Sequence, residues 1–445
     1  MKRSRYNIFV DTDDGKKLAF NSASSALAEI EADKYPTIQR ILNDPTSVST
    51  EEERQFYAAL CHGKYLIDDE VDEFATLKVR NRQQRFAKAE FSLTIAPTLA
   101  CNFKCDYCFV SQQAVRMSPE TERALLRFKE SDLKRAEKVS LTWFGGEPTL
   151  CPDTIERLQD GYRELCNRYR IDLYPSGIIT NGYLLDRAMA ARLSRAGVNT
   201  AQITLDGPQE VHDSRRRLHN GKGTFARIVD NIGEATDTMK IQIRVNVDRS
   251  NIDMTLELMD HLSDQKILPK VAMSFAEVTS SKGVCADMRD QCFSVEEFSR
   301  EQLQLYKTLM GHGYTQIQYP RAVAGGFCGA DSENSWVVSP SGDLFKCWEE
   351  LSEDKGNSVG SVFDLRPEPK HTANLNRYLA WDPFVKSDCV KCNILPLCMG
   401  GCPIRALEIN SKETGACCSW KYNLKEMLML RYLCDLQETR KEVNR

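Results

Sequence analysis

The chain has 445 residues, of which 42% are apolar and 27% are charged, a composition typical of a globular protein of about three domains. Its 59 Lys and Arg against 63 Asp and Glu give a net charge of −4, which offers no general attraction to nucleic acid or anionic lipid. Apolar runs are too short for a membrane span, and residues 1–20 lack the apolar centre of a secretory signal. We therefore expect a cytoplasmic protein without nucleic-acid or membrane partners.

Residues 1–90 are expected to form a module of their own. The pattern predicts strands over 6–10 and 17–20, helices over 22–32, 36–43 and 49–63, a strand over 65–67 and a helix from residue 69. Asp14-Gly15 favours a tight hairpin between the two strands, and Ser49/Thr50 with Glu52/Glu53 form a capping box for the third helix. This order of elements is typical of a small winged-helix-like unit.

From residue 91 to about residue 320, strands alternate with helical stretches. The expected strands cover 91–95, 139–143, 177–180, 201–205, 241–247 and 271–275. Polar stretches with helical periodicity separate them, which predicts parallel strands with helical crossovers. The fold class is therefore α/β, with a partial (β/α)6 TIM-like barrel whose chemistry gathers at the carboxyl ends of the strands.

Residues 321–445 are expected to form a third, cysteine-rich domain. A hairpin is predicted over 336–339 and 344–346, and an amphipathic helix over 420–438 closes the chain. Loops dense in Cys and Gly lie between these elements.

Seventeen cysteines are the unusual feature of the composition, and eleven of them fall in two clusters. In a reducing compartment, clustered cysteines indicate metal ligands rather than disulfides. The first cluster is Cys101, Cys105 and Cys108, directly after the first barrel strand. Three thiolates at this spacing can hold one face of a cubane cluster and leave the fourth iron open to another ligand. A zinc site is the alternative, although zinc loops usually pair C-x2-C with two further ligands nearby.

The C-x3-C-x2-C spacing, with an aromatic Tyr107 before the last cysteine, resembles the radical S-adenosylmethionine (SAM) enzymes. Motifs at successive strand ends agree with this resemblance, which implies contacts to SAM from Gly145, Gly146, Glu147, Pro148, Thr180, Asn181, Thr204, Asp206, Arg216 and Asn246. The GGEP segment is expected to hold the methionine amino group, because Gly-Gly permits close approach to a ligand and Glu147 can accept from an ammonium. Arg216 is expected near the SAM carboxylate, although a run of three arginines is more often a solvated face.

The second cluster has the layout C…G-x4-C…C-x2-C-x5-C-x3-C…C, which resembles the SPASM extension of radical SAM enzymes. The resemblance implies two auxiliary [4Fe–4S] clusters besides the SAM cluster. Cys328, Cys347 and Cys402 would hold an inner cluster, and Cys389, Cys392, Cys398 and Cys417 an outer one. The resemblance favours Cys417 over Cys418, because the family often has a lysine four residues after this ligand, as Lys421 is here. A zinc ribbon is the alternative, but it leaves Cys328 and Cys347 unexplained.

Two features of the inner cluster stay open at this point. Residues 329–346 lack the extra cysteine of some relatives, so either one iron is open or Cys285 or Cys292 supplies a fourth ligand. An open iron would suit thioether formation in a cysteine-containing peptide, because it could bind the substrate thiolate.

The resemblance implies a peptide maturase that cleaves SAM reductively and uses a 5′-deoxyadenosyl radical to abstract hydrogen from a ribosomal precursor peptide, forming a crosslink or a related modification. Its partners would be a precursor peptide with a leader and an electron donor such as flavodoxin or ferredoxin. The leader would add to an exposed strand, 6–10 or 17–20, of the N-terminal module. One alternative is a protein oxidase similar to anaerobic sulfatase maturases, which place an aspartate where this chain has Trp348. A second alternative is a non-catalytic iron–sulfur electron carrier.

Overall fold

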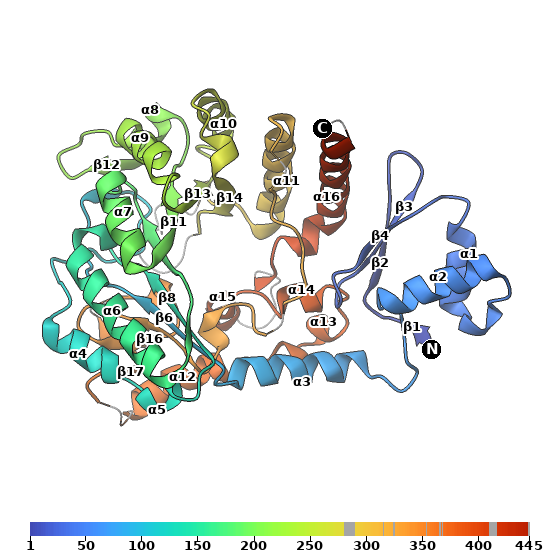
Figure 1. Cartoon of the computed structure of the whole chain (residues 1–445), viewed down its shortest axis with the longest axis horizontal. Coiled ribbons are helices and arrows are strands. Elements are labelled where there is room, and N and C mark those ends of the chain that lie inside the picture. Colours follow the sequence, from blue (N-terminus) through green and yellow to red (C-terminus); the bar gives the residue numbers. More distant parts are fainter. Residues whose placement is uncertain are drawn as a thin grey trace. The chain divides into compact units, whose positions relative to one another are not determined.

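The structure, a computed structural model, describes residues 1–279, 290–314, 316–323, 325–352, 354–364, 366, 368–408 and 416–443. The chain divides into two compact units (Figure 1). Unit 1 contains residues 1–85, 318–328 and 381–445, and unit 2 contains residues 86–317 and 329–380. The stretch expected as one cysteine-rich domain, 321–445, is thus divided between the two units, and its last part shares a unit with the N-terminal module.

Unit 2 is built on the six parallel strands that the sequence predicts. They are β6 (Glu90–Ile95), β8 (Lys138–Trp143), β10 (Ser176–Thr180), β11 (Val198–Thr204), β13 (Lys240–Val247) and β14 (Ala272–Glu277). Each pairs in parallel with the next along the chain, so their carboxyl ends lie at one edge of the sheet. The α/β fold with a parallel sheet is therefore confirmed.

Helices connect these strands or follow the last of them, and they succeed one another along the sheet (Figure 1). They are α4 (Pro119–Arg127), α5 (Glu130–Leu133), α6 (Pro152–Tyr169), α7 (Arg187–Ala196), α8 (Gln209–Arg215), α9 (Phe225–Ala235), α10 (Thr255–Asp264) and α11 (Val295–Gly311). On each strand the fully buried side chains alternate with more exposed ones, as in Val139, Leu141 and Trp143 of β8. This period of two places one apolar face of the sheet under the helices.

Short strands complete unit 2. A hairpin of β15 (Ser335–Val338) and β16 (Asp343–Phe345) adds to the sheet through parallel pairing of β15 with β6, which confirms the predicted hairpin. The remaining elements are β7 (Phe103–Cys105), β9 (Asp172–Leu173), β12 (Arg216–Leu218), β17 (Gly360–Ser361) and α12 (Pro369–Leu379).

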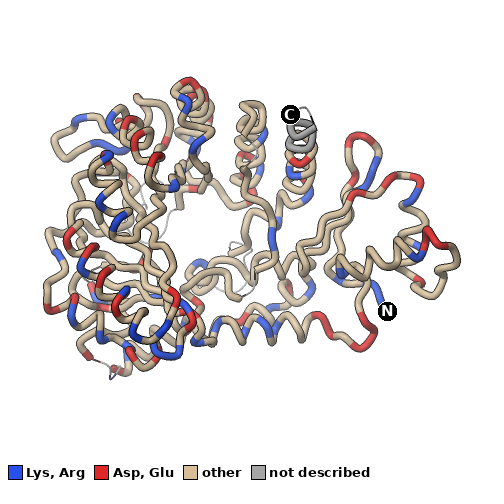
Figure 2. The backbone as a smooth tube through the Cα atoms, in the orientation of Figure 1, with Lys and Arg blue, Asp and Glu red and all other residues tan. Residues whose placement is uncertain are grey.

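Unit 1 contains a three-stranded antiparallel sheet of β2 (Asn7–Asp11), β3 (Lys17–Asn21) and β4 (Leu27–Ile30). Its other elements are β1 (Lys2–Arg3), β5 (Leu66–Ile67), α1 (Tyr35–Asn43), α2 (Glu51–His62), α3 (Glu73–Phe86), α13 (Ser387–Val390), α14 (Leu395–Cys398), α15 (Pro403–Glu408) and α16 (Trp420–Val443). Acidic residues lie just before α3 and basic residues along it (Figure 2), which suits the helix dipole. Thr50 and Glu53 form the expected capping box of α2.

The predicted helix over 22–32 is wrong, because these residues form a turn and the strand β4. The Asn21 side-chain oxygen accepts from the backbone N–H groups of Ala23 and Ser24, and Ser25 has a φ of 63°. This local turn and the pairing with β3 override the helix propensity of the Ala-rich segment. The presence of β4 also corrects the expectation that the strand over 17–20 is an exposed edge. This strand, β3, is the central one, and the sheet edges are β2 and β4.

The two faces of this sheet pack against different layers of unit 1. One face contributes Ile8, Val10, Leu18 and Phe20 to a core with Leu424 and Leu428 of α16. The other contributes Ala19 and Ile30 to a core with α1 and α2. Among the described residues, no helix has the length and apolar character needed to cross a bilayer.

Because Phe20 is fully buried between the sheet and α16, replacing it tests this packing. Phe20→Ala should cost about 3–5 kcal/mol of unfolding free energy, since the neighbouring side chains cannot fill the cavity. Urea unfolding followed by circular dichroism would measure the loss. The control is Phe363→Ala, at a side chain that is half exposed, and an equal effect of the two changes would contradict this packing.

Candidate functional site

The first cysteine cluster lies in a loop that is itself paired to another segment of unit 2. Strand β7 carries Phe103 to Cys105 and pairs antiparallel with β12, in a register that places Arg216 opposite Cys105. Backbone hydrogen bonds between the two strands therefore fix the arginine beside the cysteine. The sequence motifs alone did not indicate this pairing.

Cys101, Cys105 and Cys108 lie close enough to interact electrostatically. Burial raises the pKa of Cys101 to about 12, and the nearby Glu147 carboxylate adds to this shift. Burial also raises the pKa of Cys105 to about 11, against the lowering effect of Arg216. The thiols of Cys101 and Cys105 are therefore protonated at neutral pH without a metal, and a metal that binds them must displace their protons.

Gly145 and Gly146 lie so close to the backbone of the segment before the cysteine loop that no side chain fits at either position. A Cβ on Gly146 would lie 2.2 Å from the carbonyl oxygen of Ala100, and one on Gly145 would lie 2.4 Å from that of Thr98. Gly145 also has a φ of 122°, in the region that favours glycine. Both glycines pack against the backbone that leads to Cys101, and their close approach to a ligand stays a prediction.

Glu147 is fully buried and joins the ends of β8 and β10. Its Oε1 atom accepts from the Thr149 N–H at 2.9 Å, the Thr149 hydroxyl at 2.5 Å and the Thr180 hydroxyl at 2.7 Å. Its Oε2 atom accepts from the Asn181 N–H at 2.8 Å. Burial raises the pKa of Glu147, while these hydrogen bonds oppose the shift. The carboxylate is thus a tie between two strand-end loops.

The second strand-end loop reaches the cysteine loop through Asn181. Its Nδ2 atom donates to Asn102 Oδ1 at 2.8 Å and lies 3.9 Å from Cys101 Sγ. Pro148 and Thr204 are buried close to the ends of β8 and β11. The structure therefore places the expected residues of β8 and β10 beside the first cysteine.

A second buried network surrounds Tyr107. Its hydroxyl donates to Asp206 and accepts from Arg216 Nη1 at 2.5 Å and from Asn246 Nδ2 at 3.2 Å. The Asn246 N–H donates to the other oxygen of Asp206. Burial raises the pKa of Tyr107 well above its usual value, so the hydroxyl keeps its proton. The cysteine loop is thus tied to β11, β12 and β13 through one phenol.

Sequence reasoning missed Arg215 and Asp248, which stabilise this network. Arg215 donates to Asp248 at 2.8 Å, and its guanidinium carbon lies 5.1 Å from the centre of the Tyr107 ring. The signal in the sequence is the run of three arginines, a pattern that is more often a solvated face. Arg215 and Arg216 are in fact buried. Buried arginines at a helix end indicate paired carboxylates nearby.

Two observations test whether these residues fit SAM. Arg216 Nε is buried and has no hydrogen-bond partner among the described residues, so one N–H is available to a carboxylate. Glu147 Oε2 accepts one bond, which leaves a lone pair for an ammonium donor. Both groups lie beside the cysteine loop. The chain therefore offers complementary partners for the two charged ends of the methionine part of SAM.

Three aromatic rings extend from this loop to Cys347 within unit 2. Phe109, directly after Cys108, stacks on Phe144 at a centroid distance of 6.2 Å. Phe144 lies 5.8 Å from Trp348, which follows Cys347 and is 41% exposed. The residue after Cys347 is thus held by ring contacts.

The outer-cluster cysteines lie together in unit 1. Burial raises the pKa of Cys389 to about 11, and Cys398, Cys417 and Cys392 all interact with it. Cys418 hydrogen bonds to Cys398 and is therefore also close. No three His, Cys, Asp or Glu side chains in the described ranges are arranged to hold a single metal ion. Four thiols of this kind have the donor chemistry that an iron–sulfur cluster requires.

The inner-cluster cysteines are divided between the two units. Cys328 and Cys402 belong to unit 1, and Cys347 belongs to unit 2. Cys285, one of the two candidate fourth ligands, lies outside the described residues, whereas Cys292 lies just before α11. The ligand set of this cluster stays a prediction.

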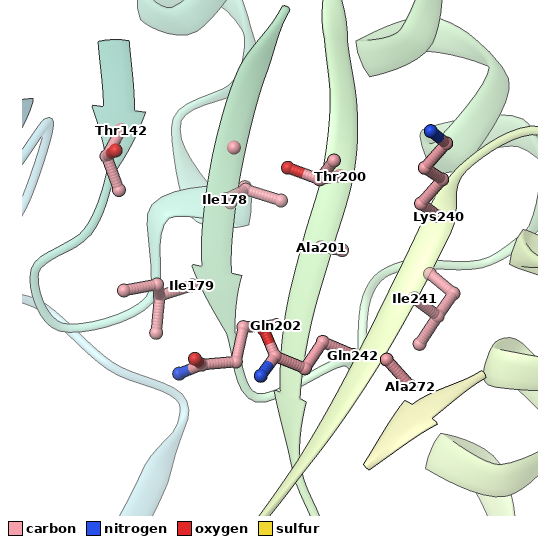
Figure 3. A pocket seen from close by; sticks show the side chains of 11 residues that line it. Thr142, Ile178, Ile179, Thr200, Ala201, Gln202, Lys240, Ile241, Gln242 and Ala272 are labelled. Atoms are coloured by element: carbon pink, nitrogen blue, oxygen red, sulfur yellow. The ribbon is translucent and has the colours of Figure 1, made fainter. Parts of the chain in front are cut away.

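A cavity of about 290 Å³ crosses the parallel sheet of unit 2 (Figure 3). The side chains of Gln202 and Gln242 lie side by side in it, and Gln242 Nε2 donates to Ser274 at 3.0 Å. Thr142, Thr200 and these amides give the cavity hydrogen-bonding groups.

The sequence model of the Radical SAM superfamily matches residues 95–262, which span β6 to α10 and include the first cysteine cluster. Curated relatives were found as well, and several are matched over only about half of their own length. One matched more fully is the mycofactocin maturase MftC of Mycolicibacterium smegmatis, 27% identical over 72% of this chain and 79% of that protein.

Solved structures of low sequence identity share the fold. The structure of anSMEcpe with bound AdoMet and the Kp18Cys peptide has a TM-score of 0.60, at 19% identity over 78% of this chain and 99% of that one. Streptococcus suis SuiB bound to its precursor peptide SuiA has a TM-score of 0.50, at 15% identity over 94% of this chain and 99% of that one. The family match supports SAM and one [4Fe–4S] cluster as cofactors.

The contact of Gly146 with Ala100 predicts a selective loss. In Gly146→Ala the new methyl group overlaps a backbone oxygen and should displace the cysteine loop, so iron bound after anaerobic reconstitution should fall. The control is Gly233→Ala in α9, where nothing lies within 4 Å and the helix should gain about 0.5–1 kcal/mol. Equal iron content in the two variants would show that the loop tolerates the methyl group.

Proposed function

We propose that this chain, a radical SAM enzyme that resembles peptide maturases, modifies a ribosomally made precursor peptide. The observation that carries the proposal is the placement of two groups beside the cysteine loop: Glu147, bound to Asn181 near Cys101, and Arg216, opposite Cys105. Their charges match those of the methionine part of SAM. A turn or a structural metal loop alone would not need these partners.

In this proposal Cys101, Cys105 and Cys108 hold the SAM cluster, Glu147 accepts from the SAM ammonium, and Arg216 binds its carboxylate. When bound, the cluster and SAM supply a 5′-deoxyadenosyl radical that abstracts hydrogen from the substrate. The chain's own part is to orient SAM and to exclude water. The hydrogen bonds of Tyr107 and the burial of Asp206 keep the loop rigid for that purpose.

A peptide substrate is supported by the relatives and by the cavity of unit 2. Solved structures of similar fold hold peptides, one of them a precursor. The amide and hydroxyl groups around Gln202 and Gln242 suit a peptide backbone, which carries one donor and one acceptor per residue.

The leader of the precursor is proposed to bind the N-terminal sheet by adding a strand to an edge. The sequence offers the strands over 6–10 and 17–20 as candidate edges. Since the edges of the sheet are β2 and β4, only the first of these, β2, can accept an added strand. Backbone hydrogen bonds to such an edge give affinity, and side-chain pockets give specificity.

A sulfatase-maturase-like oxidase is supported less well. Trp348, where that group has an aspartate, cannot accept a proton, and its ring packs on Phe144. A non-catalytic electron carrier would not require the strand-end residues that face the cysteine loop. We therefore retain the peptide maturase, with a crosslink or related modification as its product.

Three [4Fe–4S] clusters are proposed: the SAM cluster, the outer cluster and the inner cluster. The grouping of Cys389, Cys392, Cys398 and Cys417 supports the outer cluster, and Cys418, which hydrogen bonds to Cys398, is also close, so Cys417 as the fourth ligand stays a prediction. An electron donor such as flavodoxin or ferredoxin would reduce them.

The assignment is tested by changing Cys101, Cys105 and Cys108 together to Ala. About one third of the reconstituted iron should be lost, together with all formation of 5′-deoxyadenosine. The matched control changes Cys61, Cys151 and Cys166, which lie outside both cysteine clusters, together to Ala. It should keep its iron content and its cleavage of SAM. Cleavage that survives in the first variant would refute the assignment.

Glu147→Gln tests whether the carboxylate contacts a ligand. The substitution keeps the size of the side chain but replaces one acceptor oxygen by an NH2 group, which cannot accept from the N–H of Asn181 or from the donors of Thr149 and Thr180, so the tie between the loops is weakened as the charge is removed. SAM affinity should fall by about 1.5–3 kcal/mol, and iron content is measured beside it to detect any displacement of the cysteine loop. Calorimetric titration of the reconstituted protein measures the affinity, with Glu156→Gln, at a partly exposed ion pair on α6, as the control. Unchanged affinity would mean that the carboxylate only joins the two loops.

A further inference from the structure

The C-x2-C loop of the outer cluster is held by residues near the start of the chain. Arg5 Nη2 donates to the carbonyl oxygen of Val390 at 2.5 Å, and the Ser22 hydroxyl donates to that of Asn393. Val390 and Asn393 each follow one cysteine of this loop directly. The two hydrogen bonds therefore hold the loop on both sides of its second cysteine.

Apolar contacts support the same arrangement. Tyr6 and Leu77 form a core with Leu395, and both cysteines of the loop pack against that core. The Arg5 guanidinium carbon lies 5.4 Å from the centre of the Tyr6 ring and 5.4 Å from that of Phe74. These rings restrict the arginine side chain and reduce the entropy lost when it binds the carbonyl oxygen.

Local structure supplies little rigidity to this loop. The helix α13 that contains Cys389 has four residues, and an isolated helix of that length is not stable in water. The contacts from Arg5 and Ser22 span 385 and 371 positions of sequence, so they form only when the whole unit is folded. They can therefore fix the two thiols in place before iron arrives.

We propose that Arg5 and Ser22 are positioning residues of the outer-cluster site, so that the N-terminal segment forms part of this metal site as well as a peptide-binding module. The inference rests on the proposed function, because it presumes the outer cluster. Ser22 is buried, and Arg5, although exposed, lies against the rings of Tyr6 and Phe74, which restrain its side chain.

The experiment compares Arg5→Ala, Ser22→Ala and the double variant in the full chain after anaerobic reconstitution. Two controls come from the same segment. Arg3→Ala removes an arginine that binds Gln39 and Asn43, and Ser24→Ala removes a hydroxyl that donates to the Gly63 carbonyl. Neither control touches the cysteine loop in these contacts.

The measurements are iron per chain, the rate of iron loss to a chelator, the electron paramagnetic resonance spectrum and 5′-deoxyadenosine formation. The double variant should lose one cluster's share of iron, about one third, or release that share at least about tenfold faster, while SAM cleavage continues. Arg5→Lys keeps a donor near Val390, so it should retain more iron, and release it more slowly, than Arg5→Ala.

Iron content and release rates equal to those of the controls would overturn the inference. Loss of all clusters together with cleavage would overturn it too, because the residues would then support the whole fold. Failure of the proposed function is a separate result, since it would appear as absent 5′-deoxyadenosine in the unaltered protein.

Discussion

The buried carboxylate of Glu147 is the contact on which the arrangement of the strand-end loops depends. It accepts hydrogen bonds from the end of β10 while its own residue follows β8, and it lies beside Cys101. Without this acceptor, the donors of Thr149, Thr180 and Asn181 would be buried and unsatisfied, at about 1–3 kcal/mol each. A charged group buried at this cost is retained where it serves a site.

Tyr107 and Asp206 play the same part for the other strands. The Tyr107 hydroxyl accepts hydrogen bonds from Arg216 and Asn246 and donates one to Asp206. Residues at β11, β12 and β13 therefore meet at the cysteine loop. The two networks meet the loop at different points, Glu147 near Cys101 and Tyr107 near Cys108. Rigid loops of this kind fix the geometry that a radical reaction needs, because small displacements of the reacting atoms are costly.

Much of this arrangement could be predicted from the sequence. The six parallel strands follow from buried apolar runs separated by helical stretches, and parallel pairing then places GGEP and Thr180-Asn181 at one edge. The strand β4 could not be predicted, because Ala, Leu and Glu favour a helix and only pairing with β3 overrides them. The pairing of Arg216 with Cys105 was also hidden, since register between distant segments leaves no pattern in either one.

The contacts between the N-terminal module and the Cys389 loop were hidden for the same reason. From the sequence, residues 1–90 and 321–445 are separate domains, and a leader-binding role needs only the first. In the structure the sheet has apolar residues on both faces, and α16 covers one of them. A module with two apolar faces cannot be stable in water alone, because the uncovered face would stay exposed. The N-terminal sheet and the cysteines of the outer cluster therefore share one folded unit, and the packing of Phe20, Leu428 and Ile394 couples a change in one to the other.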